Sequence, residues 1–466
     1  LKGKLDAGKN HHKMSVPTLV RLLAVLQNVA TALPAAHATR IGDQMMSMLT
    51  EFEVPSSLLN GMIRAAHAIH TCLQGGTAIG NDGALQRWGG PLVSKCGALL
   101  RDYVLHGLSP LSSSTSLNHS AVAMAMGQED DDDGRKRAVA KAVAENARIV
   151  RVLFTLGEIA LVGVVREQGD GGDAPEGGIA GQGATVKIPG TIVAAVQILL
   201  APDLTKEIGE ADAANDLNSD LTATDMESSS SPRSVRLIIP TPIRAHAFVT
   251  LGKLCLRDRN LTKEFVPLFA RELQNRSVPD SIRNNILIIF GDLCTRFTSQ
   301  LSQYVPNMAA CLQDPEPVIR RHSLLLLAQL LRRDYIRLRP GVFFRLAAVL
   351  ADPLADLRER AEHMLTDMFL VKQPKLFLNN FLQTVAVLTG CRGYELNPGT
   401  AVASATTVPQ SEVSAPVALA AANPEPDSDA GGASLEDILV DVNIADLTGF
   451  HAAAGRDKRR EVYARL

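Results

Sequence analysis

The chain has 466 residues, enough for roughly three globular units of about 150 residues or for one elongated array. Hydrophobic residues make up 46% and charged residues 21%, which excludes a wholly disordered chain. Aromatic residues make up only 4%, so an aliphatic helical core is favoured over a β-sandwich. The net charge of −2 excludes a uniformly basic nucleic-acid binder but allows a local basic face.

The chain begins at Leu1 and stops within an expected helix, so we expect a fragment of a longer protein. In the first helices apolar side chains recur at three- and four-residue steps, as at Leu19, Leu22 and Leu26, which indicates amphipathic helices. No segment alternates convincingly with period two, so an all-α architecture is predicted. The predicted helical segments are 1–109, 135–165, 185–204, 236–391 and 435–466.

Four linkers separate these segments. Each is rich in Ser, Gly, acidic residues or Ala and Pro, and none can bury enough apolar surface to offset the entropy of ordering. We therefore predict disordered insertions at 110–134, 166–184, 205–235 and 392–434.

A repeat decides the architecture of residues 236–391. An aliphatic residue followed by Arg recurs at Ile243-Arg244, Ile282-Arg283, Ile319-Arg320 and Leu357-Arg358, with the arginines 39, 37 and 38 residues apart. Seven and ten residues after each arginine the chain has large apolar residues, and eight after it has a small residue or Thr. These offsets predict one buried stripe per helix and a close approach by a neighbouring helix.

A period near 38 with two helices per unit resembles HEAT repeats, whose helix pairs stack into a solenoid. We therefore predict an all-α HEAT-repeat α-solenoid, with divergent HEAT-like helices in 1–109. The resemblance implies a ladder in which turn aspartates and second-helix arginines bond along the stack. The first repeat has Thr241-Pro242 and no equivalent Asp. The ladder residues would be Arg244, Arg283, Arg320, Arg358, Asp280, Asp314 and Asp352.

Several runs resemble the non-SMC HEAT subunits of condensin more specifically. They are IRAHAFVTLGKLCL from Ile243, IRNNILIIFGDLCTR from Ile282, YVPNM from Tyr304 and CLQDP from Cys311. Phe343–Arg345 and Gly455–Arg460 are most similar to the D-type subunit of condensin II, and Val152–Ala160 also fits that family.

That resemblance implies a non-catalytic subunit without a cofactor, located in the nucleus on chromosomes. Its implied partners are the kleisin and SMC subunits and chromatin DNA, with histone tails as a further candidate. Neither a membrane nor a small-molecule substrate is expected. The alternatives are the equivalent subunit of condensin I, or a HEAT scaffold for transport or for a phosphatase with no DNA contact.

Residues 236–388 contain 21 Lys and Arg but 13 Asp and Glu, a local excess of eight positive charges. This excess favours a solenoid face that contacts DNA phosphates without reading bases. The alternative is an ordinary solvated surface, with Arg320 in the ladder. The candidate binding residues are Arg320, Arg321, Arg332, Arg333, Arg337 and Arg339.

Other motifs point to no chemistry. His67 and His70 share a helix face, but no Cys, Asp or Glu nearby completes a metal set, so an ordinary structural role is expected. The glycines of 177–183 lack the GK[ST] ending of a phosphate loop. Ser231-Pro232 fits a minimal proline-directed kinase site, and Ser231 is a candidate phosphosite; an inert linker is the alternative.

Overall fold

The structure is a computed structural model that describes residues 15–73, 81–107, 132–162, 186–207, 234–372, 374–389, 450 and 455–465. It divides into two compact units, Leu1–Phe297 and Thr298–Leu466. The predicted linkers lie wholly or largely outside the described residues, as does Ser231.

The first unit is mainly helical. Its elements in chain order are α2 (Val16–Val29), the 3₁₀ turn η1 (Ala30–Ala32), α3 (Ala35–Glu51), α4 (Ser56–Leu73), α5 (Asn81–Asp102), the π-helical turn η2 (Tyr103–Gly107), α7 (Asp132–Leu161), α8 (Gly190–Ile198), β1 (Asp203–Glu207), β2 (Ser234–Ile238), α10 (Thr241–Arg257), α11 (Arg259–Gln274) and α12 (Asp280–Arg296).

The second unit is helical throughout its described residues. Its elements are α13 (Thr298–Leu301), the 3₁₀ turn η3 (Ser302–Tyr304), α14 (Val305–Ala310), the 3₁₀ turn η4 (Cys311–Gln313), α15 (Pro317–Arg332), α16 (Pro340–Val349), α17 (Ala355–His363), the π-helical segment η5 (Met364–Leu370), α18 (Leu376–Thr389) and α21 (Arg456–Arg465).

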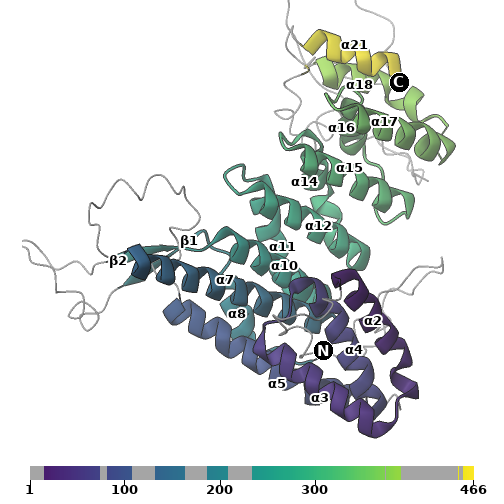
Figure 1. Ribbon diagram of the computed structural model, residues 1–466. Helices are drawn as coiled ribbons and strands as arrows, with labels where there is room; N and C mark the ends of the chain where they lie inside the picture. The colour runs from purple at the N-terminus through teal and green to yellow at the C-terminus, as the bar shows by residue number, and fades with distance from the viewer. Residues whose placement is uncertain are drawn as a thin grey trace, which may run out of the picture. The chain divides into compact units, whose positions relative to one another are not determined.

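Helices of the first unit form stacked pairs (Figure 1). α3 packs against α4, α5 against α7, α8 against α10 and α11 against α12. The second helices of these pairs stack in the order α4, α7, α10, α12, and α2 packs on α4. The stack therefore extends well upstream of the residues in which the sequence shows a period.

The predicted stripe forms the core of this stack. The residue before each anchor arginine and the residue seven positions after it are buried in all four repeats, as at Ile243 and Leu251. The residue ten positions after the arginine is buried in three repeats, and Met368 in the fourth is partly exposed. The small residue is required at Gly252, because a Cβ there would lie 2.7 Å from Cγ1 of Ile289 on α12. α10 and α12 can thus approach closely only without a side chain at this position.

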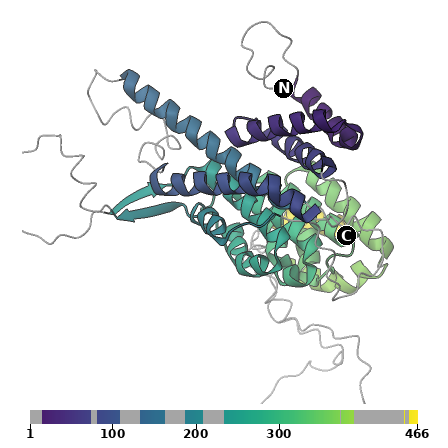
Figure 2. The same ribbon diagram turned by 90° about the horizontal axis from the view of Figure 1, so that it is seen from below.

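One element departs from the expectation that no strand forms. β1 and β2 pair antiparallel, with Asp203 opposite Ile238, and Figure 2 shows them as a ribbon projecting beyond the helices of the first unit. Each strand has five residues, which is too short for a period-two pattern to stand out from its surroundings. The ribbon lengthens the turn between α8 and α10 and leaves the helical class of the fold unchanged.

The ladder prediction needs correction at the first repeat. Arg244 does not bond to a turn aspartate of the next repeat; its Nη2 pairs with Oε2 of Glu272 on α11 at 2.9 Å, and its Nε donates to the Leu200 carbonyl at 2.7 Å. Glu272 is itself nearly buried, so it supplies the charge that this guanidinium needs inside the stack. Arg283 is buried, donates to the Val278 carbonyl and pairs with Asp280 within its own turn.

In the second unit the same positions link consecutive repeats. Arg320 binds the Asp352 carboxylate with two nitrogens, Nε at 2.7 Å and Nη2 at 3.2 Å, and its Nη1 donates to the carbonyls of Asp314 and Pro315 in its own turn. Arg358 makes the same bonds within its own turn, because its Nη1 donates to the carbonyls of Asp352 and Pro353. Each arginine therefore closes the turn before its own helix, and Arg320 also holds the next turn.

α21 takes the place of the next repeat beside α17. Nε of Arg358 lies 3.5 Å from Oε1 of Glu461, and Arg465 pairs with Glu362 at 2.6 Å. Val462 of α21 is fully buried. Two ion pairs thus fasten α21 to α17.

Two histidines of the first unit enclose Trp88. The His70 ring stacks on the Trp88 ring, with centroids 6.0 Å apart and an angle of 11°, and His67 lies at 6.0 Å with a tilt of 41°. Among the described residues, His67 Nδ1, His70 Nε2 and Trp88 Nε1 have no hydrogen-bond partner. Burial lowers the pKa of both imidazoles below the usual 6.5; the charge of His70 adds to this for His67, while Asp43 opposes it for His70.

The Arg320–Asp352 pair is the first target for mutation. We expect Arg320→Met to lower the free energy of local opening of α15 and α17 by about 3–5 kcal/mol, because Asp352 is left buried without its partner. Hydrogen exchange read by mass spectrometry measures this opening. The neighbouring Arg321→Met is the control, since Arg321 pairs with Asp356 on the exposed surface. Equal protection in the two variants would contradict the ladder role.

The histidine cluster predicts acid sensitivity of the first unit. Because the folded pKa values lie below that of the unfolded chain, the unfolded state takes up more protons as pH falls below about 6.5. Stability should therefore be full above pH 7 and decline towards pH 5.5, measured by urea unfolding. The His67→Gln, His70→Gln double variant should flatten this decline, whereas the exposed His37→Gln should not. A decline that the double variant leaves unchanged would place its origin elsewhere.

Candidate nucleic-acid interface

The six candidate arginines occupy α15 and the loop that follows it. Arg320 and Arg321 lie near the start of α15, and the other four are exposed between its last residue and the start of α16. We call these four, Arg332, Arg333, Arg337 and Arg339, the arginine loop. Among the residues that the structure describes, none supplies an acidic partner to them.

The structure separates the first two arginines from the arginine loop. The Arg320 side chain is only 11% exposed and is bound to Asp352. Arg321 shares Asp356 with Arg360, and these two guanidiniums, Arg360 foremost, hold the pKa of that carboxyl below its usual value. Arg320 is thus held inside the array and Arg321 in an exposed ion pair, so the positive charge without an acidic partner among the described residues lies in 332–339.

A helix cap sets the course of the arginine loop. α15 ends in a Schellman motif, in which the amide of Tyr335 donates to the Leu330 carbonyl and that of Asp334 to the Leu331 carbonyl. Asp334 adopts φ 58°, a left-handed conformation that Asp tolerates better than most residues. Its carboxylate pairs with Lys372 at 2.8 Å, so the one acid within the loop does not offset the four arginines.

The end of the loop is fixed by the next helix. Arg339 stands at the N-cap of α16, with Pro340 at the first helical position, and its carbonyl accepts from the amides of Val342 and Phe343 at 3.0 Å. Ile336 is buried at 8% exposure and anchors the middle of the loop. The backbone is therefore held at both ends and at its centre, while the guanidiniums project from it.

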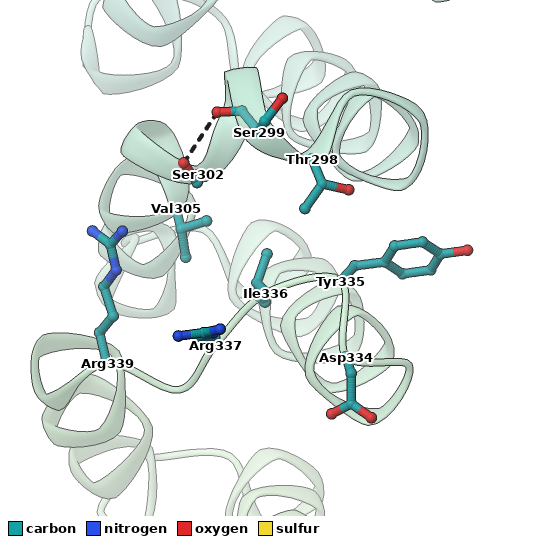
Figure 3. A pocket seen from close by; sticks show the side chains of 9 residues that line it. All are labelled: Thr298, Ser299, Ser302, Val305, Asp334, Tyr335, Ile336, Arg337 and Arg339. Carbon is teal, nitrogen blue, oxygen red and sulfur yellow. Dashed lines mark hydrogen bonds between the residues drawn. The ribbon is translucent and has the colours of Figure 1, made fainter. Parts of the chain in front are cut away.

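A groove runs between the loop and the chain at 298–305. It has a volume of about 320 Å³, and Val305, Ile336, Arg337 and Arg339 contribute to its lining. Figure 3 shows the two arginines on one side, the serines of α13 and η3 on the other, and Tyr335 directed away from the cavity.

Within the described ranges, no three His, Cys, Asp or Glu side chains gather in a way that could hold a metal ion. In the same ranges no helix combines the length and apolar character needed to traverse a bilayer.

Comparisons with known proteins agree with the HEAT pattern. Residues 178–273 match the family model of condensin-2 complex subunit D3-like HEAT repeats, and 281–395 match that of non-SMC mitotic condensation complex subunit 1. The matched residues are thus similar to D3-like condensin HEAT repeats. The predicted resemblance and the helical HEAT class are confirmed by this match.

The curated relatives that the chain matches are D3 subunits of condensin-2. Condensin-2 complex subunit D3-L of Xenopus laevis is 28% identical over 375 residues, 79% of this chain and 21% of the relative. The mouse (Mus musculus) subunit D3 is 30% identical over 163 residues, 35% of this chain and 11% of the relative. Subunit CAP-D3 of Arabidopsis thaliana is 29% identical over 150 residues, 32% and 11% of the two chains. The chain thus spans about a fifth or less of these relatives.

Three features of this site were not predicted from the sequence. Nothing in the spacing showed that Asp334 is paired with Lys372, because the two residues are 38 positions apart. The groove was not predicted because its walls come from separate repeats. The Schellman cap could have been suspected, since a left-handed residue commonly follows a helix, but the usual signal there is Gly rather than Asp.

Proposed function

We propose that the chain is part of a non-catalytic D3-like subunit of condensin II that acts in chromosome condensation. In this proposal it binds a kleisin segment, works beside the SMC subunits and contacts chromatin DNA in the nucleus. The similarity to condensin-2 subunits D3 supports membership of the complex. Histone tails are not part of this proposal.

The arginine loop carries the DNA part of the proposal. Four exposed guanidiniums within eight residues have no acidic partner in the described chain, and Asp334, the one acid within 332–339, is paired with Lys372. Arginines in such an arrangement bind backbone phosphates and release counterions, irrespective of base sequence. The loop is anchored through its backbone and through Ile336, so its charges can be changed without disturbing the core.

Charge reversal tests the DNA contact. Changing all four arginines of the loop to Glu should weaken binding of duplex DNA by about tenfold or more at low salt and reduce the slope of log affinity against log salt by up to about 4. Fluorescence anisotropy at several salt concentrations measures both. The matched control changes four exposed basic residues elsewhere to Glu: Arg64, Lys141, Arg148 and Lys263. An equal loss in both variants, or no loss in either, would exclude the loop as the DNA contact.

Capture of the kleisin tests membership of condensin II. The chain should retain the kleisin of condensin II more strongly than that of condensin I in a pull-down with purified segments. The Arg320→Met variant should weaken this capture only if the stack itself forms the surface. Preference for the condensin I kleisin would support the first alternative. Capture of a phosphatase catalytic subunit or a transport cargo, with neither kleisin retained, would replace the proposal by a scaffold function.

A further inference from the structure

We propose that the groove beside the arginine loop binds a phosphorylated serine or threonine on an extended peptide. The groove holds about 320 Å³ between the segment from α13 to α14 and the loop at 334–339. This volume suits one modified side chain and its neighbours rather than a folded domain. The site goes beyond the proposed DNA contact, although Arg337 and Arg339 take part in both.

The basic side of the groove suits a phosphate monoester. Arg337 and Arg339 both line it, and each guanidinium offers up to five N–H donors in a planar fork. A phosphorylated side chain carries close to two negative charges and three acceptor oxygens, so two forks can share it, whereas a carboxylate has only two oxygens. Figure 3 shows both arginines reaching the groove from the same stretch of backbone.

Hydroxyl groups on the opposite wall complete the polar set. The Ser302 hydroxyl lines the groove and donates to the Ser299 carbonyl at 3.2 Å, so its oxygen can accept from a peptide amide. The Ser299 hydroxyl makes no hydrogen bond with the described chain and is exposed. Ser299 can therefore donate to a phosphate oxygen or to a peptide carbonyl without breaking an existing bond.

An apolar floor favours a peptide over nucleic acid. Val305 is 3% and Ile336 8% exposed, and both border the groove between its two polar walls. A peptide has aliphatic carbons that such a floor can contact, whereas a nucleic-acid backbone presents only sugars and phosphates. Unpaired bases stack on aromatic rings; Tyr335 belongs to the lining, but in Figure 3 its ring extends outward, away from the two arginines.

The arginine loop therefore has two faces. Arg337 and Arg339 border the groove, whereas Arg332 and Arg333 belong to the last turn and C-cap of α15 and do not line it. The two pairs lie on the same loop and have the same charge, so each serves as a control for the other.

Binding of a degenerate phosphopeptide library to the full chain tests the proposal. The probe is a fluorescent nonapeptide library with a central phosphoserine, compared with the same library carrying Ser or Glu there. We expect binding at least about tenfold tighter for the phosphoserine library, and competition by free O-phosphoserine. Arg337→Gln with Arg339→Gln should abolish the difference, while Arg332→Gln with Arg333→Gln should retain it.

Ser299→Glu provides a second variant from the opposite wall. It leaves both arginines in place and should also abolish the preference for phosphoserine, with an unchanged circular dichroism melting curve for every variant. Equal binding of the three libraries would overturn the proposal, as would equal weakening by the two arginine pairs. If single-stranded DNA shows the dependence on Arg337 and Arg339 and phosphopeptides do not, the groove serves nucleic acid and the proposal is wrong, while the DNA function stands.

Discussion

Each helix pair of this chain has an apolar stripe that only a neighbouring pair can bury, and the rest of the structure depends on that constraint. At Ile243, Leu251 and Leu254 the side chains of α10 are almost inaccessible because α7 and α12 cover them. Stacking therefore buries both faces of every inner pair, and only the turns and outer edges stay exposed for binding. The arginine loop lies at such a turn, between α15 and α16.

The buried arginines solve a problem that stacking creates. A turn between helices exposes carbonyls that the next repeat would bury without partners. Arg320 and Arg358 each donate to two turn carbonyls through one nitrogen, and the rest of the guanidinium faces an acid. That acid is Asp352 for Arg320 and Glu461 for Arg358. The constant element is the arginine with its turn, and the source of the carboxylate varies.

Because the source of the carboxylate varies, the sequence predicted the buried arginines but not all of their acidic partners. The stripe and anchor arginines recur at a fixed period, so their burial could be predicted from spacing alone. Glu272 and Glu461 could not be foreseen as partners, since they lie outside the turn position that supplies Asp352. The helices before residue 236 belong to the same stack, but the long segments between α5, α7, α8 and α10 obscure their period.

For the candidate site, the composition predicted the excess of positive charge, but it did not predict which arginines are paired with acids and which are exposed. Arg320 and Arg332 differ by only twelve positions, yet one is locked onto Asp352 and the other is exposed. Which arginines are free depends on acids from the following repeat, such as Asp356, and on the cation of Lys372. These are contacts across the stack, which local sequence does not encode.

The positions of two long insertions agree with the same constraint. In the first unit, 108–131 separates α5 from α7 and 208–233 separates α8 from α10, so both interrupt the link between the two helices of one pair. Doubling a loop's length costs only about 0.6 kcal/mol, whereas a break within a helix would expose part of the stripe. Extra chain is therefore tolerated at the links between paired helices.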